Sequence, residues 1–356
     1  MAAVKPPPPL YTLCGEIFFK GARCLSLGAV CGVHSVRSIS LSAGMVAAVA
    51  LATVVILVYS VVTSSLGALP GLLSADTAFS AALITLGWVV SAVRLKLLLE
   101  SYGGRVRLPL LDAVAIRLIG GLVANITPSS IGGEPARAYY VSRRTGLGMA
   151  ESYALVIYEV YYDVIAVNLA GVFLSIQALP LSTPVLLVAV FMSTSWLYAS
   201  FKVSKTGRSV GDGSSLPRWV PGFLRSRFNA LYARYLEFAR SYSSVSSSIP
   251  LRVKAAAWAL TLVYHTIWGL AVVPFTGSAA LPLAARAVEA YFLMQSFSSL
   301  PTPGGSGAAE YGLSLLLDPS TVVKYRVLYY YYGVVVGLAV LAAYDSLLRR
   351  MGKTSG

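Results

Sequence analysis

Two short segments rich in proline and glycine interrupt long apolar stretches of the chain. The first is Pro128-Ser-Ser-Ile-Gly-Gly-Glu-Pro135, which follows an apolar stretch at about 110–127. The second is Pro301-Thr-Pro-Gly-Gly-Ser-Gly307, which follows another at about 281–299. Proline and paired glycines cannot continue a helix that faces lipid, because the freed backbone groups find no water there. Each segment therefore predicts either a kinked span or a re-entrant hairpin buried within the protein.

The composition places these segments in a membrane. Of the 356 residues, 56% are apolar and only 12% are charged, and the mean hydropathy is +0.72. A soluble domain carries about 25% charged residues, so a soluble fold is excluded. Six further apolar stretches are long enough to cross a hydrocarbon layer of about 30 Å. They lie at about 43–63, 79–99, 152–176, 182–202, 255–275 and 326–348.

The basic residues decide between a full span and a hairpin. The net charge is +14, and membrane proteins concentrate Lys and Arg on the cytoplasmic side. If both interrupted segments are hairpins, 23 of the 28 Lys and Arg residues face the cytoplasm, and the outer loops 64–78, 177–181 and 276–280 contain none. The count therefore favours hairpins. It predicts a multi-pass protein of the cell membrane with both termini in the cytoplasm, and it accounts for the basic charge without nucleic acid as a partner.

The predicted fold is an all-α polytopic membrane protein with about six full spans and two re-entrant helical hairpins. Residues 43–176 form a first half and residues 177–348 a second half, with the same order of elements in opposite orientation. Such an inverted-topology repeat, with matched interruptions in its halves, points to a substrate site near the bilayer midplane. Residues 1–42 are predicted as a basic N-terminal tail without a secretory signal, and residues 349–356 as a C-terminal tail.

A basic cytoplasmic loop at 203–254 lies inside the second half. Its 222–245 part combines aromatic residues and leucines with four arginines at imperfect helical spacing. This pattern predicts an amphipathic helix on the anionic lipids of the inner leaflet. The alternative is a plain basic loop that only obeys the cytoplasmic charge bias.

Ionisable residues inside the apolar stretches are candidate site residues, because each costs about 2.5–3.5 kcal/mol at the bilayer centre. The candidates among them are Arg117, Glu134 and Arg137 around the first interruption, Glu159 and Asp163 in 152–176, and Glu310 after the second interruption. Arg286 and Glu289, near the outer interface, are expected to form a structural pair. Glu159 and Asp163 share a helical face, so they repel unless a cation lies between them. Arg117 and Arg137 are the candidate cations. The alternative for each of these charges is a structural ion pair.

The glycine pairs allow two interpretations. A helix that begins at Gly133 or Gly305 would direct free backbone N–H groups into the membrane interior, where they suit an anion such as phosphate. Arg137, one turn further on, would add a bidentate contact. Alternatively, Gly132, Gly133, Gly304 and Gly305 only permit tight turns. His265 is expected to be a hydrogen-bonded packing residue, and the tyrosines at 329–332 are expected to form an interfacial belt.

Together these motifs resemble the flippase-like membrane domain of lysylphosphatidylglycerol synthases, over roughly 45–350. The residues that carry the resemblance are Gly132-Gly133-Glu134-Pro135-x-Arg137, Glu159-x-x-x-Asp163 and Pro303-Gly304-Gly305-x-Gly307-x-x-Glu310. The family's motif positions carry over as Glu134, Arg137, Gly304, Gly305 and Glu310. The resemblance implies a domain that moves lipid to the outer leaflet. Because the sequence ends eight residues after Leu348, a stand-alone translocator without aminoacyl-transfer chemistry is expected.

The leading hypothesis is a translocator that moves an anionic or polyprenyl-linked lipid between leaflets. Its phosphate would lie on Arg137 and on the Gly132 and Gly133 backbone, and Glu134, Asp163 and Glu310 would hold cationic groups or exchange protons. One alternative is an intramembrane lipid-phosphate enzyme, although no nucleophile and base stand together at either interruption. Another is a scaffold for a partner glycosyltransferase, which would bind the 203–254 loop. No cofactor and no metal are expected.

Overall fold

The computed structural model describes residues 43–102, 106–127, 132–209, 222–300 and 302–353, and every regular element within them is helical. The predicted all-α polytopic fold is therefore confirmed. The predicted tail at 1–42 lies outside the described residues. The elements, in chain order, are α2 (Ala43–Val62), η1 (Leu66–Leu72), α3 (Ala75–Ser101), α4 (Leu110–Asn125), α5 (Gly133–Thr145), α6 (Met149–Gln177), α7 (Thr183–Ser209), α8 (Gly222–Ser248), α9 (Leu251–Leu270), η3 (Val273–Thr276), α10 (Leu281–Phe297), η4 (Pro303–Gly305), α11 (Ala308–Ser314) and α12 (Pro319–Lys353).

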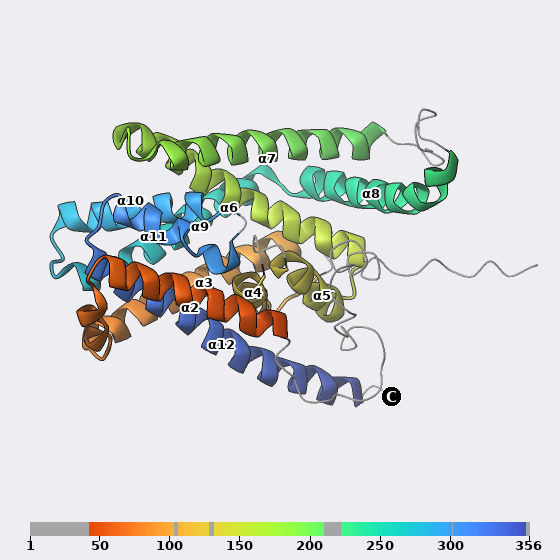
Figure 1. The fold of residues 1–356 in the computed structure, drawn as a ribbon. Coiled ribbons are helices and arrows are strands. Elements are labelled where there is room, and N and C mark those ends of the chain that lie inside the picture. The colour runs from red at the N-terminus through yellow and green to blue at the C-terminus, as the bar shows by residue number, and fades with distance from the viewer. Residues whose placement is uncertain (1–42, 103–105, 128–131, 210–221, 301, 354–356) are drawn as a thin grey trace, which may run out of the picture.

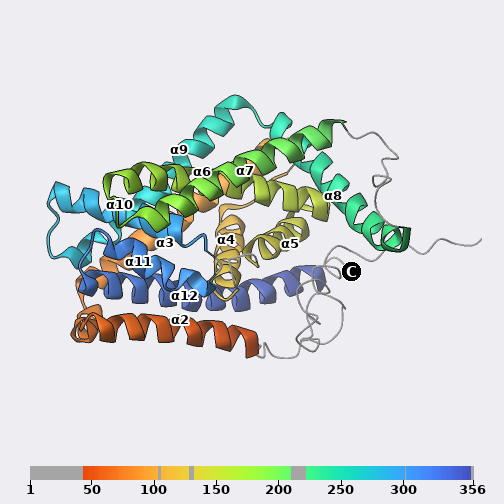
Figure 2. The same cartoon turned by 45° about the horizontal axis from the view of Figure 1, so that its top comes forward.

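Long apolar helices stand at the predicted spans. Five segments of the described chain are long and apolar enough to cross a membrane, and α2 with η1 makes a sixth that bends by 118°. The five are α3, α6, α7, α9 continued through η3, and α12. In Figure 1 most of these helices run in roughly the same direction, and Figure 2 shows α2 alongside α12 at one edge of the molecule. Helix α12 is longer than predicted, since it begins at Pro319 and continues to Lys353.

The first interrupted segment folds back on itself. Gly133, at the start of α5, lies against the end of α4, because a Cβ there would come within 2.8 Å of the Gly120 carbonyl oxygen. At the other ends of the same two helices, Arg144 Nε donates to Asp112 Oδ2 at 2.6 Å. Helices α4 and α5 are therefore antiparallel. They open toward the end of the molecule that holds 106–109 and 146–148, which we name the second end.

The second interrupted segment folds back toward the opposite side. Gly312 of α11 lies against the backbone of Met294 in α10, where a Cβ would approach the Cα atom to 2.6 Å. Tyr311 donates its hydroxyl to the Leu181 carbonyl, and Thr321 donates to the Phe275 carbonyl at 2.9 Å. These contacts place the open side of the hairpin beside the turns 178–182 and 271–280, which we name the first end. The two hairpins thus open to opposite ends of the molecule.

The two interruptions approach each other inside the molecule. A Cβ on Gly304 would lie 3.4 Å from the carbonyl oxygen of Asn125, at the end of α4. The side-chain nitrogen of Asn125 lies 3.2 Å from the position that a Cβ on Gly333 of α12 would take. A short residue at these positions is required for such close approach. The tips of both hairpins therefore meet beside α12, away from either end.

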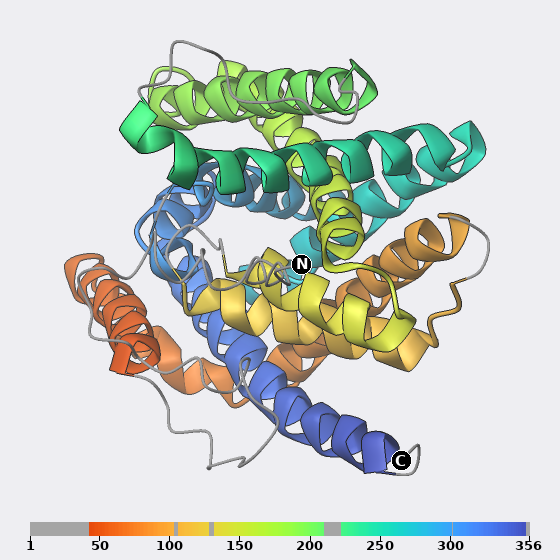
Figure 3. The ribbon, with the colours of Figure 1, turned by 90° about the vertical axis from the view of Figure 1, so that its right-hand side faces the viewer.

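Helix α8 occupies the predicted amphipathic segment, but part of its apolar face is buried against protein. Leu236, Ala239, Tyr242 and Val245 are buried, and Tyr242 exchanges a hydrogen bond of 2.8 Å with Ser200 of α7. Figure 3 shows α8 alongside α7. The helix is thus held on the bundle by its second half, and contact with anionic inner-leaflet lipids stays a prediction.

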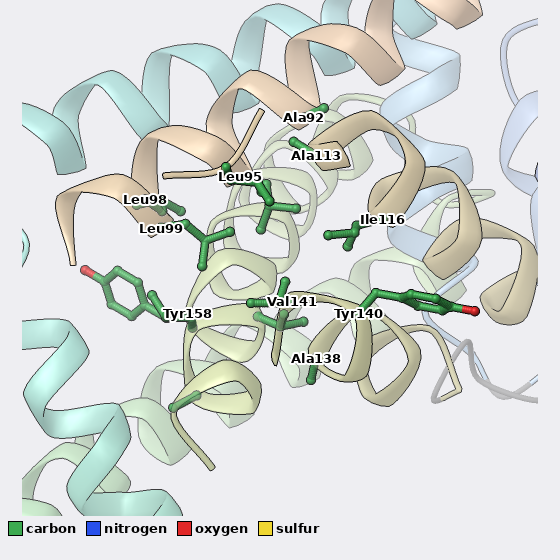
Figure 4. Close-up of a cluster of buried hydrophobic side chains, with 14 of the residues drawn as sticks. Ala92, Leu95, Leu98, Leu99, Ala113, Ile116, Ala138, Tyr140, Val141 and Tyr158 are labelled. Carbon is green, nitrogen blue, oxygen red and sulfur yellow. The ribbon is translucent and has the colours of Figure 1, made fainter. Parts of the chain in front are cut away.

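The hairpin α4–α5 is fixed by an apolar core next to the second end. The members labelled in Figure 4 come from α3, α4, α5 and α6, with Leu95, Leu98 and Leu99 from α3 pointing toward Ile116 of α4 and Val141 of α5. All five side chains are essentially inaccessible. Burial of each such side chain stabilises the fold by about 1.5–3 kcal/mol. This core decides where the neighbouring polar residues of the same helices stand.

Candidate functional site

Arg94 stands at the centre of a buried ionic cluster. Its side chain is fully buried, and its two terminal nitrogens contact Glu159 and Asp163 of α6, the latter at 2.5 and 2.9 Å. Nη1 also donates to the hydroxyl of Thr261 in α9 at 2.6 Å. Tyr264 of α9 donates to the same Asp163 carboxylate and lies under the guanidinium. Arg94 therefore holds the two carboxylates of α6 together and compensates part of their charge.

Arg137 and Arg117 approach the same carboxylates from the first hairpin. Arg137 donates to Glu159 and lies 3.4 Å from Glu134, three residues earlier on α5. Arg117 of α4 lies 3.3 Å from Glu159 and 3.5 Å from Asp163. The five predicted residues around the first interruption and in α6 are thus brought together. The predicted role of an arginine between Glu159 and Asp163 is filled by Arg94 as well as by Arg117.

The charges of the cluster balance, and its side chains differ in exposure. Three arginines face three carboxylates, so the formal charge is neutral when all are ionised. The side chains of Arg94 and Glu159 are fully buried, whereas those of Arg117, Asp163 and Glu134 are exposed by 14%, 18% and 20%. A buried ion pair is costly to break because each charge loses its only compensation. Arg117 lies on the exposed side of the cluster, where an anionic ligand can replace a carboxylate as its partner.

The adjoining apolar core positions these charges. Except for Glu134, each ionic residue of the cluster follows or precedes a core residue in sequence, as Arg94 precedes Leu95 and Arg117 follows Ile116. In Figure 4 these core side chains converge between α3, α4 and α5. The charges lie about 10–20 Å along their helices from the second end, at 1.5 Å per residue. Because the core fills the space on that side, the cluster is closed toward the second end.

The first pair of glycines serves close packing in this structure. The Gly132 N–H donates to the Thr127 hydroxyl at 3.2 Å, so it is not free for an anion. At Gly133 a side chain would collide with the Gly120 carbonyl and with Ala124. The same close approach occurs at Gly120, where a Cβ would lie 2.3 Å from Cγ of Arg137. These observations favour the interpretation in which glycine permits the tight hairpin.

Glu310 belongs to a second buried ion pair. Its Oε1 accepts from Arg326 Nε of α12 at 2.7 Å, and its Oε2 accepts from the Gly307 N–H at 2.6 Å. Arg326 also donates to the Gly304 carbonyl at 3.2 Å. Gly304 and Gly305 have φ of +59° and +69°, a backbone region that favours glycine. The second predicted motif is therefore assembled as a turn locked by an ion pair, apart from the carboxylates of α6.

Two arginines of these sites escaped the sequence prediction. Arg94 lies near the cytoplasmic end of the predicted span 79–99, and Arg326 begins the predicted span 326–348, so both positions are typical of interfacial arginines. The structure corrects both, since Arg94 is fully buried and Arg326 is 2% exposed. The signal that could have revealed their burial is the length of α3 and α12, because each helix extends well past its arginine toward the nearer end of the molecule. Ser101 ends α3 seven residues after Arg94, and Pro319 begins α12 seven residues before Arg326.

His265 and Tyr329 are polar neighbours of the cluster. His265 is 3% exposed, as expected for a packing residue, and it contacts Tyr291 of α10 through Nδ1 at 3.1 Å. Tyr329 lies beside Gln295 and stacks on Tyr325, so it faces the interior and not a membrane interface. Within the described part of the chain, no three His, Cys, Asp or Glu side chains are placed to hold a metal ion.

These features define a polytopic helical membrane protein with a buried ionic site at a re-entrant hairpin. The chain belongs to the family described as "Lysylphosphatidylglycerol synthase TM region", which matches residues 45–337. It is 28% identical over 275 residues to a UPF0104 membrane protein of Archaeoglobus fulgidus, across 73% of this chain and 79% of that protein. No solved structure matches. The predicted family resemblance is confirmed.

Proposed function

We infer that this protein moves a phosphate-bearing lipid between the two leaflets of the cell membrane. The observation that carries this proposal is the uneven hold on the three arginines. Arg94 and Arg137 make close contacts with buried carboxylates, whereas Arg117 makes only long contacts of 3.3–3.5 Å and remains 14% exposed. Arg117 is the cation that a lipid phosphate can take over at the lowest cost.

The neighbouring residues suit such an exchange. An arginine presents a planar fork of donors that matches a phosphate in a bidentate contact. When Arg117 turns to a phosphate, Arg94 still contacts Glu159 and Asp163, and Arg137 still contacts Glu159, so neither carboxylate of α6 loses all of its partners. The Glu134 carboxylate, which is 20% exposed beside Arg137, can receive a cationic part of the headgroup.

The fold supports movement between leaflets. The two hairpins open to opposite ends and meet at their tips, which is the arrangement expected of an inverted repeat that rocks around a midplane site. Two apolar cores, one near each end, would open in turn. The family name supports a lipid as the substrate, and the distribution of basic residues supports cytoplasmic termini in a cell membrane.

The test compares Arg117→Ala with Arg286→Ala in proteoliposomes that contain phosphatidylglycerol with a fluorescent acyl chain. Chemical quenching from outside measures movement between leaflets. A lost charge-assisted contact is worth about 1.5–3 kcal/mol, so Arg117→Ala is expected to slow movement by about tenfold or more. Arg286 is an exposed arginine near the first end and serves as the matched control.

The expected result is slow movement only in the Arg117 variant, with the lipid chemically unchanged. Wild-type movement in both variants would overturn the proposal. Release of phosphate from the lipid would instead favour the intramembrane enzyme. Chromatography of the recovered lipid distinguishes these outcomes.

A further inference from the structure

A buried histidine points an unpartnered nitrogen at the ionic site. His265 of α9 is 3% exposed, and its Nε2 has no hydrogen-bond partner. That nitrogen lies 3.7 Å from Oδ1 of Asp163. The other ring nitrogen, Nδ1, lies 3.1 Å from the Tyr291 hydroxyl. A buried polar atom without a partner is costly, so its place beside a carboxylate calls for an explanation.

The hydrogen-bond pattern favours a proton on Nε2 of the neutral imidazole. The Tyr291 hydroxyl oxygen accepts from Gln295 Nε2 at 2.8 Å, so its own hydrogen is free to be donated to His265 Nδ1. A neutral imidazole has one N–H, which is then on Nε2 and faces Asp163. The lone pair of Nδ1 accepts from Tyr291. In this state the ring is neutral and adds no charge to the cluster.

Every charged or titratable group that faces His265 bears on its protonation. These groups are Arg94 of α3, Arg117 of α4, Asp163 of α6, Tyr264 of α9 and Tyr291 of α10. The three arginines already balance the three carboxylates of the cluster. A proton on His265 would therefore add an uncompensated positive charge while the site is empty. Burial makes such a charge strongly unfavourable.

Binding of an anion reverses this balance. A phosphate group brings negative charge, and it draws Arg117 away from its 3.5 Å contact with Asp163. His265, already 3.7 Å from that carboxylate, is then the nearest neutral group able to gain a positive charge. A proton added at Nδ1 makes both ring nitrogens donors, with Nε2–H toward Asp163 and Nδ1–H toward the Tyr291 oxygen, whose own hydrogen turns away. No covalent bond other than the new N–H forms.

We propose that His265 is a proton-binding site that takes up a proton when a phosphate-bearing lipid headgroup binds beside Arg117, and releases it when the lipid leaves. This inference rests on the proposed function and assigns the coupling ion of that same site. It makes lipid binding and proton binding mutually reinforcing, since each ligand raises the affinity for the other by the same factor. Lipid affinity therefore rises as the pH falls through the range in which His265 titrates.

The experiment measures proton uptake directly. Purified protein in weakly buffered detergent with a pH dye receives dioctanoyl phosphatidylglycerol, and calorimetry gives the affinity at several pH values. Wild type is expected to take up about one proton per bound lipid, and its affinity to rise by up to about tenfold per pH unit of acidification. His265→Gln is expected to bind lipid with no uptake and no pH dependence. His34→Gln, which changes the other histidine of the chain, serves as the control.

A second measurement does not depend on the folding of the His265 variant. In His34→Gln protein labelled with 15N-histidine, His265 gives the only imidazole signals, so NMR reports its protonation alone. The signals are expected to change from the neutral to the doubly protonated pattern when the lipid is added at constant pH. An imidazole that stays neutral, or proton uptake that persists in His265→Gln, would overturn the proton site.

Failure of the proposed function looks different. No binding of dioctanoyl phosphatidylglycerol at any pH would remove the lipid site, and with it the proton coupling. Glycerophosphoglycerol, the deacylated headgroup, serves as the water-soluble probe because it carries the same phosphodiester. Equal proton uptake with glycerophosphoglycerol would overturn the lipid as substrate and leave the proton site standing. No uptake with glycerophosphoglycerol, beside uptake with the lipid, supports both proposals.

Discussion

Glu310 shows how a residue in a family motif can serve the fold. Its two carboxylate oxygens are both occupied within the protein, one by Arg326 and one by the Gly307 N–H. The pair is almost fully buried. A carboxylate with no free oxygen and no exposed edge has little capacity to bind a substrate. Its predicted role as a substrate-binding residue is therefore less consistent with the structure than that of Glu134, which keeps an exposed edge.

We predict that Glu310→Gln destabilises the protein without a selective loss of lipid binding. The change leaves the Arg326 charge buried without compensation, which costs about 3–5 kcal/mol. Thermal unfolding in detergent should therefore show a larger drop for Glu310→Gln than for Glu134→Gln. The double variant Glu310→Gln/Arg326→Gln should recover part of the loss. A Glu310→Gln protein as stable as wild type that no longer binds lipid would show a substrate role instead.

The sequence identified most charges of the site but not their partners. Arg117, Arg137, Glu159 and Asp163 stood out because they interrupt apolar stretches, and the structure brings them together. Arg94 did not stand out, because arginine near the end of a span is ordinarily drawn to the interface by its long side chain. Its partners lie on α6 and α9, far away in sequence. Contacts of this kind are set by packing between helices, which no local pattern encodes.

At the scale of elements, the packing of α4 against α5 depends on Gly120, whereas the next residue, Gly121, makes no such contact. A Cβ on Gly120 would lie 2.3 Å from Cγ of Arg137, whereas nothing lies within 4 Å of a Cβ on Gly121. The two residues are adjacent in the same helix. They therefore offer a matched pair of substitutions that differ in tertiary contact and share the same local backbone.

We predict opposite effects for Gly120→Ala and Gly121→Ala. Alanine is favoured over glycine in a helix by about 1 kcal/mol, so Gly121→Ala should be as stable as wild type or more stable. Gly120→Ala should displace Arg137 from Glu159 and slow lipid movement by about tenfold, the size of a lost charged hydrogen bond. The proteoliposome assay and thermal unfolding check both variants. Equal movement in the two variants would show that Arg137 needs no fixed position.

The interruptions predicted the hairpins, but the ends of the elements were less well predicted. Proline and glycine break helices by their own backbone chemistry, so the two breaks are visible in the sequence. The start of α12 is not visible in the sequence, because Pro319, Ser320 and Thr321 resemble a loop. They are helical because Asp318 accepts from the backbone N–H groups of Ser320 and Thr321 at 3.0 Å each. Tertiary contacts such as Thr321 with Phe275 then hold that first turn.

At the scale of the whole molecule, the ionic sites stand at similar depths from opposite ends. Arg94 lies about 10 Å along α3 from the second end, and Arg326 lies about 10 Å along α12 from the first end, at 1.5 Å per residue. Each ionic site lies on a hairpin that opens toward the end of the molecule nearer to that site. A row of hydrogen-bonding side chains from His265 to Tyr329 runs between them. This arrangement suits a molecule in which closure at one end is coupled to opening at the other.

The orientation of this arrangement in the membrane can be tested by cysteine labelling. With the three native cysteines changed to serine, single cysteines replace Leu73, Arg143 and Ser209, all of which are exposed. Loops rich in Lys and Arg stay in the cytoplasm, and Leu73 lies in the 64–78 loop, which has neither. An impermeant maleimide should therefore label Leu73→Cys in intact cells. It should label Arg143→Cys and Ser209→Cys only after the membrane is permeabilised. Because α4 and α5 return to the same end, labelling of Arg143→Cys from outside together with Leu73→Cys would contradict the hairpin, whereas reversal of all three would only invert the protein.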